Sequence, residues 1–298
     1  MTKTTSRLNP EAPEASTTAA SGPVRPYRLM AVLAHPDDES LGVGGTLARY
    51  AAEGADVFVL TATRGEGGGY RGHRPADPGH PGPAALGSIR ESELRAAGAA
   101  LGVREVTMLD YADGQLDRAD QRRVVADIAG HLRRVRPDVV ITFGPEGAYG
   151  HPDHIAISQF TTAAIVAAAD ANYADIDARH AAAHSVSKLY YIAWSQATWA
   201  AYQEAVKRLA ATVDGVERLV APWPAWAITT TIDTRDVWPT VWRAVSCHES
   251  QVTAYGRLQD LTLEHHEGLW GRQSFYRAFS LVNGGRAHET DLFLGITT

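Results

Sequence analysis

Short apolar segments alternate with helical segments between residues 27 and 170, and this alternation restricts the possible folds more than any other feature of the sequence. The segments 29–34, 56–63 and 138–143 are almost continuously apolar, as is typical of strands buried on both faces of a sheet. A strand, a helix and a second strand in succession form a βαβ unit, whose two strands run parallel. The pattern therefore predicts an α/β fold with a Rossmann-like, mostly parallel sheet and flanking helices.

The remaining predicted elements define how the domain is organised. In the first part we expect helices at 44–53, 88–101, 118–135 and 151–169 and a short strand at 106–109. Beyond residue 170 we expect strands at 188–193, 227–232 and 292–296 and helices at 198–209, 237–247 and 251–265. We therefore predict a disordered tail at 1–26 and a single domain at 27–298. Within it, 27–170 is the Rossmann-like core and 171–298 is a smaller C-terminal α+β portion that shapes specificity.

Composition and charge exclude several classes of partner. The net charge is −6 and the sequence has no basic run, which argues against binding to nucleic acid. The sequence contains no run of 18 apolar residues that would span a membrane and no secretory signal. A single cysteine, Cys247, suits a reducing compartment and cannot form a thiolate metal site alone. We expect a cytoplasmic protein that acts on a small molecule, and a homo-oligomeric assembly is compatible with the sequence.

Two clusters of histidine and aspartate follow two of the predicted buried strands. His35-Pro36-Asp37-Asp38-Glu39 comes after the first strand, and Tyr149-Gly150-His151-Pro152-Asp153-His154 comes after the strand at 138–143. Open parallel sheets bind their ligands outside the carboxyl ends of the strands. We therefore expect the two clusters to meet at one edge of the sheet.

Their side chains are those of a catalytic zinc site. Such a site takes three nitrogen or oxygen ligands and leaves one position for water. The Asp37-Asp38 pair offers one carboxylate to bind metal and another to take a proton from water. His151 and His154 are three residues apart at a predicted helix start, so one can bind metal while the other faces the substrate. Asp153 could fix the tautomer of a histidine.

The two motifs, AHPDDES and YGHPDH, resemble those of the LmbE-like, or PIG-L, N-deacetylases, which include the mycothiol-biosynthesis deacetylase and mycothiol S-conjugate amidase. The resemblance runs from about residue 28 to the end of the sequence. It implies that the ligands of one Zn²⁺ per chain are His35, Asp38 and His154. It also implies that Asp37 is the general base and that His151 stabilises the oxyanion or protonates the leaving amine.

The resemblance assigns further residues to the catalytic and substrate-binding groups. Asp153 would orient His151 and keep it protonated, and Tyr149 would match a mobile tyrosine of the mycothiol enzymes. Arg90 and Asp113 would hold polar groups of the substrate, and Glu66 would stand at the rim of the pocket. The implied function is metal-dependent hydrolysis of an N-acyl group, with N-acetyl favoured, on an amino sugar or glycosylated small molecule. Fe²⁺ or another divalent ion remains an alternative to zinc.

Three alternative functions use the same sequence features. The first is an amidase that cleaves a larger mycothiol-type conjugate with the same metal site and a wider pocket. The second is a dinucleotide-binding protein, suggested by Gly42-Val43-Gly44-Gly45 near the first strand. Asp37, Asp38 and Glu39 disfavour it, because they would face the pyrophosphate. The third is a sugar-binding module without metal, which a metal analysis distinguishes from an enzyme.

Overall fold

The computed structural model describes residues 25–173, 182–205, 210–213, 215–219, 222–253, 260–285 and 287–297. The tail predicted at 1–26 lies almost entirely outside these residues. The first part of the chain alternates strands and helices: β1 (Arg28–Leu33), α1 (Asp38–Ala52), β2 (Asp56–Thr63), α2 (Pro83–Leu101), β3 (Glu105–Tyr111), the 3-10 turn η1 (Leu116–Arg118), α3 (Gln121–Val135), β4 (Val139–Phe143), α4 (Gly147–Gly150) and α5 (Pro152–Ala169).

The C-terminal part begins with β5 and is mixed. It contains β5 (Lys188–Ile192), α6 (Gln196–Ala205), β6 (Ala210–Val213), β7 (Val216–Leu219), η2 (Ala225–Ala227), β8 (Thr230–Asp233), α7 (Trp238–Cys247), α8 (Glu249–Val252), α9 (Leu263–Trp270) and β9 (Arg272–Ser280). No helix among the described residues is both long enough and apolar enough to cross a bilayer.

The main sheet confirms the predicted fold class. It has seven strands in the order β3-β2-β1-β4-β5-β9-β8, and the first five of these strands pair in parallel. β9 pairs antiparallel with both β5 and β8, which gives the sheet an antiparallel extension. The chain order reverses between β1 and β4, and this is the switch point at which doubly wound sheets bind ligands.

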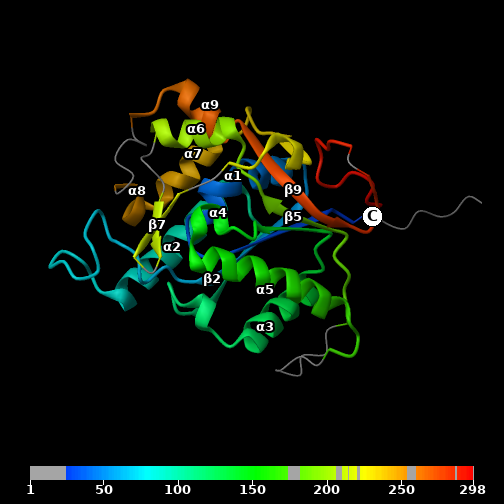
Figure 1. The fold of residues 1–298 in the computed structure, drawn as a ribbon, viewed down its shortest axis with the longest axis horizontal. Helices are drawn as coiled ribbons and strands as arrows, with labels where there is room; N and C mark the ends of the chain where they lie inside the picture. The colour runs from blue at the N-terminus through cyan, green and yellow to red at the C-terminus, as the bar shows by residue number, and fades with distance from the viewer. Residues whose placement is uncertain are drawn as a thin grey trace, which may run out of the picture.

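Helices cover both faces of this sheet. α3 and α5 pack against each other on one face, and α1 packs with α2 and α7 on the other (Figure 1). α3 shows how the sequence determines such a layer. The Asp120 side chain caps its N-terminus by accepting hydrogen bonds from the N–H groups of Arg122 and Arg123. Val124, Ile128 and Leu132 recur every four residues and form the buried face of the helix. The strands between the layers are buried on both faces, which explains their continuous apolar runs.

Several predicted boundaries are wrong, mostly in the C-terminal part. α1 begins at Asp38 rather than 44, because acidic residues in the first turn are favourable at a helix N-terminus. The helix predicted at 251–265 is instead α8, which ends at Val252, and α9, which begins at Leu263. Residues 292–296 form turns rather than a strand. The sequence analysis missed β9 and the β6–β7 hairpin.

Residues near 293 pack against the start of β1. The ring of Phe293 stacks on Tyr27 with ring centroids 4.5 Å apart, and it meets Tyr50 edge-on at 5.1 Å. The Tyr50 hydroxyl donates to the Asp291 carboxylate at 2.9 Å and accepts from the Leu292 N–H at 2.7 Å. The apolar residues at 292–296 therefore complete the core beside β1 and α1 instead of extending the sheet.

Candidate active site

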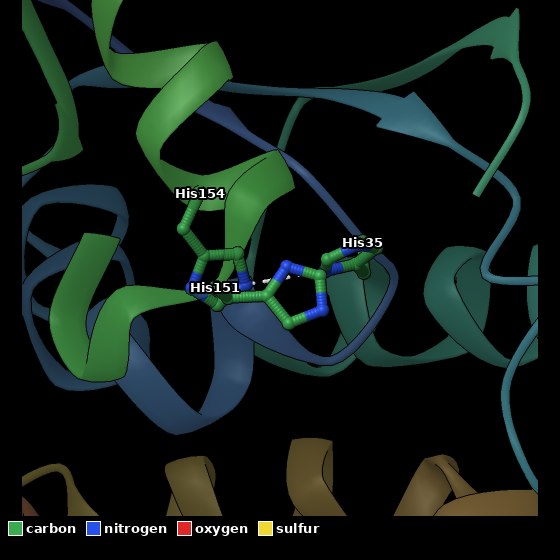
Figure 2. Close-up of side chains that lie close together, drawn as sticks. All are labelled: His35, His151 and His154. Atoms are coloured by element: carbon green, nitrogen blue, oxygen red, sulfur yellow. Dashed lines mark hydrogen bonds between the residues drawn. The ribbon is translucent and has the colours of Figure 1, made fainter. Parts of the chain in front are cut away.

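The two histidine–aspartate motifs meet at the switch point of the sheet. β1 and β4 are parallel neighbours, so their carboxyl ends lie at the same edge. His35 follows β1, whereas His151 and His154 lie at the start of α5, which follows β4. Figure 2 shows the three imidazoles converging on one point from these two segments.

Two imidazole nitrogens and one carboxylate meet near this point. His35 Nδ1 lies 3.2 Å from His154 Nε2 (Figure 2). The Asp38 carboxylate spans the pair, with Oδ2 3.6 Å from His35 Nδ1 and Oδ1 3.5 Å from His154 Nε2. Ligands about 2.0–2.1 Å from a tetrahedral zinc are separated by about 3.3–3.4 Å. The donor set therefore fits a divalent metal of zinc's size, with two imidazole nitrogens and one carboxylate.

Backbone groups and a second carboxylate orient the side chains of Asp38 and His35. The N–H groups of Ala34 and His35 donate to Asp38 Oδ2 at 3.2 and 2.8 Å. On its far side, His35 Nε2 lies 3.1 Å from Asp153 Oδ2, and Asp153 itself accepts from the N–H groups of Gly114 and Leu116. A carboxylate on the distal nitrogen of a ligand histidine fixes its tautomer and its orientation.

The geometry corrects the role predicted for Asp153. The sequence analysis expected its carboxylate to orient His151, but the carboxylate lies on His35. The physical reason is the position of Asp153 in the first turn of α5, where its side chain is fully buried and turns toward the loop after β3. Asp153 contacts His151 through its backbone N–H, which donates to His151 Nδ1 at 3.2 Å.

The charge states of two ligands suit metal binding. Burial lowers the pKa of His154 to about 3, with a further contribution from His35, so its imidazole is neutral. Burial by itself would raise the pKa of Asp38, but the neighbouring His154 and the hydrogen bonds from His35 outweigh it and lower the pKa. A neutral imidazole and an ionised carboxylate are the forms that bind metals.

Asp37 lies beside the ligands with a different environment. Its backbone has φ 103°, a left-handed conformation that is rare for a residue other than glycine. Its carboxylate lines the pocket, with Oδ2 3.2 Å from a guanidinium nitrogen of Arg90. Burial and the nearby Asp38 raise the pKa of Asp37 to about 6, although Arg90 opposes the rise. Asp37 therefore places a buried carboxylate of raised pKa in the pocket, beside His35, Asp38 and His154.

His151 lines the same pocket from the start of α5. Its Nδ1 accepts a backbone hydrogen bond, so a neutral His151 carries its proton on Nε2. Burial and the neighbouring His35 lower its pKa, although Asp153 acts in the opposite direction. Asp153 thus acts on the pKa of His151 in the expected direction, but burial and His35 outweigh it. One ring nitrogen of His151 lies within 4.8 Å of ligand atoms of His35 and His154, so the three histidines form a second possible donor set.

Tyr149 lies on the short segment α4, directly before His151. The preceding Ala148 has φ 62°, so the backbone turns sharply there and directs Tyr149 into the pocket. The Tyr149 ring meets His154 edge-on with centroids 5.4 Å apart. Tyr149 thus lines the pocket beside both histidines of its motif.

Of the three residues expected to bind substrate, Asp113 and Arg90 line the pocket and Glu66 does not. Asp113 lines the pocket, with Oδ1 3.1 Å from His35 Nε2 and Oδ2 accepting from Gly67 N–H. Arg90 also lines the pocket, but its guanidinium binds Asp37 and the carbonyls of Pro36 and Gly65. Glu66 is not among the pocket-lining residues; its Oε1 accepts from Asp113 N–H at 2.9 Å. The prediction that Glu66 forms the rim is therefore wrong, because its carboxylate supports the Asp113 loop.

Four residues that the sequence analysis did not assign to the site belong to it or support it. Trp194, Tyr202 and Gln251 line the pocket opposite the ligands, and the rings of Trp194 and Tyr202 stack with centroids 4.6 Å apart. His248 lies behind Asp37, with Nε2 2.7 Å from Glu39. All four come from the C-terminal part, where no short motif marks them. The tryptophan content was the only available signal, and it did not distinguish pocket from core.

The doubly wound sheet carries the imidazoles of His35 and His154 and the carboxylate of Asp38 at its switch point, with the carboxylate of Asp37 beside them. This arrangement is typical of metal-dependent hydrolases. Residues 30–165 match the family model of PIG-L, the GlcNAc-PI de-N-acetylases. A protein named 1D-myo-inositol 2-acetamido-2-deoxy-α-D-glucopyranoside deacetylase, from Kineococcus radiotolerans, is 36% identical over 91% of this chain and 84% of its own length. A protein of the same name from Rhodococcus jostii is 39% identical over 76% of this chain and 82% of its own length. The chain belongs to the PIG-L, or LmbE-like, family.

Solved structures show the same fold. An N,N'-diacetylchitobiose deacetylase from Pyrococcus horikoshii has a TM-score of 0.62 at 21% identity, covering 84% of this chain and 83% of that one. A 4-carboxy-2-hydroxymuconate hydratase from Pseudomonas putida has a TM-score of 0.63 at 20% identity, covering 88% of this chain and all 100% of that one. Since one is a deacetylase and the other a hydratase, the fold alone does not determine the reaction, and the site must do so.

Proposed function

We propose that this protein removes the N-acetyl group from an N-acetylglucosamine-type amino sugar, using one divalent metal ion held by His35, Asp38 and His154. The observation that carries the proposal is the meeting of His35 Nδ1, His154 Nε2 and the Asp38 carboxylate, at distances of 3.2–3.6 Å, beside the carboxylate of Asp37. The names of the two bacterial relatives support the choice of an acetylated amino sugar. Zinc is the first candidate, because it accepts this mixture of nitrogen and oxygen ligands, with Fe²⁺ as the alternative.

The bound metal would supply Lewis acidity toward the amide carbonyl and the attacking water. Asp37 then takes the proton of that water at its carboxylate, which Arg90 holds in place at 3.2 Å. Its position outside the donor set leaves it available for this role. Burial and the nearby Asp38 also raise the pKa of Asp37 to about 6, close to the neutral range in which a general base works best.

His151 acts on the opposite side of the reacting carbonyl. With Nδ1 engaged by the Asp153 N–H, the Nε2–H group is the hydrogen-bond donor, and it stabilises negative charge on the carbonyl oxygen. The departing amine takes the proton that Asp37 removed from the water, so the base returns to its carboxylate form and His151 stays neutral. Tyr149 borders the same space and completes the wall around the oxyanion.

The pocket has one polar side and one apolar side, as expected for a sugar site. Asp113 and Arg90 provide charged groups near the ligands, and Leu41, Trp194 and Tyr202 provide an apolar surface. Sugars bind to such sites through hydroxyl hydrogen bonds together with contact against aromatic rings. We also propose a cytoplasmic location, which the single cysteine suits.

The test is release of acetate from defined substrates by the metal-loaded protein. The panel contains N-acetylglucosamine, N,N'-diacetylchitobiose and 1D-myo-inositol 2-acetamido-2-deoxy-α-D-glucopyranoside, with Zn²⁺ or Fe²⁺ added separately. We expect hydrolysis of at least one substrate, and hydrolysis at least ~10²-fold slower with Asp37→Asn. Cleavage only of larger thiol conjugates would favour the amidase alternative, and inactivity on every amide would overturn the proposal.

A further inference from the structure

A buried carboxylate, Glu39, lies directly behind Asp37 and joins it to a distant part of the chain. The Glu39 side chain is 0% exposed. Its Oε2 accepts the backbone N–H of Asp37 at 2.9 Å, and its Oε1 lies 2.7 Å from Nε2 of His248. The Ser40 hydroxyl donates to the same Oε1 at 2.5 Å. Both oxygens of Glu39 are therefore engaged in hydrogen bonds.

The hydrogen bond from Asp37 matters because of the backbone conformation at that residue. With φ 103°, Asp37 adopts a left-handed conformation that a side chain with a Cβ disfavours. Such a conformation persists only when surrounding contacts determine it. The Glu39 carboxylate is one such contact, since it binds the Asp37 N–H and so fixes the direction of the peptide that precedes the side chain.

His248 reaches Glu39 from outside the segment that carries the family motifs. It connects α7 to α8 and is 1% exposed, so its imidazole is buried with the carboxylate. The segment that carries it is held at two further points. Ser250 donates to Glu93 of α2 through its N–H and its hydroxyl, at 2.7 and 2.6 Å, and its carbonyl accepts from Arg71 N–H at 2.7 Å. His248 is thus held in place independently of Asp37.

We propose that His248 is a positioning residue for the hydrolysis proposed above. Through Glu39 it fixes the backbone of Asp37 and therefore the place of the Asp37 carboxylate in the pocket. A buried charged pair by itself is weak evidence for a stabilising role, because desolvation offsets the attraction between the two groups. The pair of His248 and Glu39 is connected to the reaction through the second oxygen of Glu39. That oxygen accepts the backbone N–H of Asp37, the residue with the left-handed backbone and the proposed base.

The test compares two substitutions that differ in one hydrogen bond. His248→Leu removes the donor to Glu39, whereas His248→Gln places an amide N–H close to the position of Nε2. We expect His248→Leu to lower kcat at least ~10-fold, because displacing a catalytic group by about 1 Å can cost up to ~10²-fold. KM should change by no more than about twofold, since substrate contacts remain, and the bound metal should be unchanged. His248→Gln should restore most of kcat.

A second readout does not depend on activity. Because the Asp37 N–H is the group that Glu39 holds, its amide exchange should accelerate in His248→Leu and stay slow in His248→Gln. His184→Leu is the control, since His184 is a buried histidine whose Nε2 lies 2.8 Å from the Pro137 carbonyl, before β4 begins. It should lower thermal stability and leave kcat and the Asp37 exchange unchanged.

Two results would overturn the inference. The first is an amide exchange rate of Asp37 that is unchanged in His248→Leu. The second is a fall in kcat for His248→Leu that is no larger than the fall for His184→Leu, when the two variants lose the same thermal stability. If the wild-type protein hydrolyses no amide, the proposed function fails, but the exchange measurements still decide whether His248 fixes Asp37.

Discussion

The carboxylate of Asp153 lies 3.1 Å from Nε2 of His35, a residue 118 positions earlier in the chain. Since His35 Nδ1 is one of the proposed metal-binding atoms, Asp153 would act on a bound metal through the far side of the same ring. We expect Asp153→Asn to weaken metal binding about 10- to 100-fold, as loss of such a carboxylate usually does. Competition with a chelator measures this, and Asp110→Asn, at a carboxylate 88% exposed, is the control. Unchanged affinity would show that Asp153 has no such role.

Removal of a direct ligand should have a larger effect on metal content. The protein purified without added metal should contain about one divalent ion per chain, held as the 3.2–3.6 Å donor spacing indicates. His154→Ala leaves two donors and should abolish stoichiometric binding. Elemental analysis of the dialysed proteins gives the answer, and full retention of metal in His154→Ala would exclude that residue from the ligands.

Asp37→Asn separates proton transfer from metal binding. The substitution keeps the size of the side chain but removes the proton acceptor, so turnover should fall at least ~10²-fold, the usual contribution of a general base. Metal content should stay at the wild-type level, because Asp37 is outside the donor set. Near-normal turnover would contradict the assignment of Asp37 as the base.

His151→Ala distinguishes an oxyanion-stabilising histidine from a ligand. If Nε2–H stabilises the oxyanion, turnover should fall roughly 10²- to 10⁴-fold while metal content is unchanged. If His151 instead binds the metal with His35 and His154, as their proximity within 4.8 Å permits, the variant should lose metal. Metal content and kcat measured on the same samples decide between the two.

The sequence predicted the site better than the C-terminal half of the fold. β1, β2 and β4 are buried on both faces, so their apolar runs are visible without knowledge of their partners. β9 is only partly buried and pairs with β5 and β8, which are far from each other in the sequence, so its formation depends on long-range contacts.

Within the site, too, local motifs were predictable from the sequence and contacts with distant residues were not. His35, Asp38 and His154 follow predicted strands at recognisable motifs, and the parallel pairing of β1 and β4 brings them together. Sequence spacing does not specify the directions of side chains at helix ends. It therefore did not predict that the Asp153 carboxylate contacts His35 or that His248 supports Asp37 through Glu39.

A buried ion pair far from the pocket predicts how stability depends on pH. Glu289 is 1% exposed and lies 2.9 Å from Lys188 and 2.7 Å from Arg277. Burial by itself would raise its pKa, but hydrogen bonds from Tyr190 and Lys188 outweigh it and lower the pKa from 4.5 to about 2. The unfolded chain therefore binds this proton more readily, so the contribution of Glu289 is complete above pH 4.5 and declines as the pH falls toward 2.

Glu289→Gln should remove that contribution. We expect the free energy of unfolding at pH 7 to fall by about 3–5 kcal/mol, because the buried Lys188 loses its partner. The difference between wild type and variant should shrink as the pH is lowered from 5 to 3 in urea titrations. Glu249→Gln, at a carboxylate 71% exposed, should show little effect at any pH. A difference that does not depend on pH would contradict the lowered pKa.

Tyr27, directly before β1, donates its hydroxyl hydrogen bond to the carbonyl of Ile296, 269 residues later in the chain. Its ring stacks on Phe293, which also covers Tyr50. During synthesis the first strand therefore leaves the ribosome long before the residues that cover its neighbouring rings. Until those residues emerge, Tyr27 and Tyr50 remain exposed apolar surface, the kind that promotes aggregation of nascent chains. The half of the protein that carries the two histidine–aspartate motifs thus reaches its final packing only after residues 293–296 have emerged.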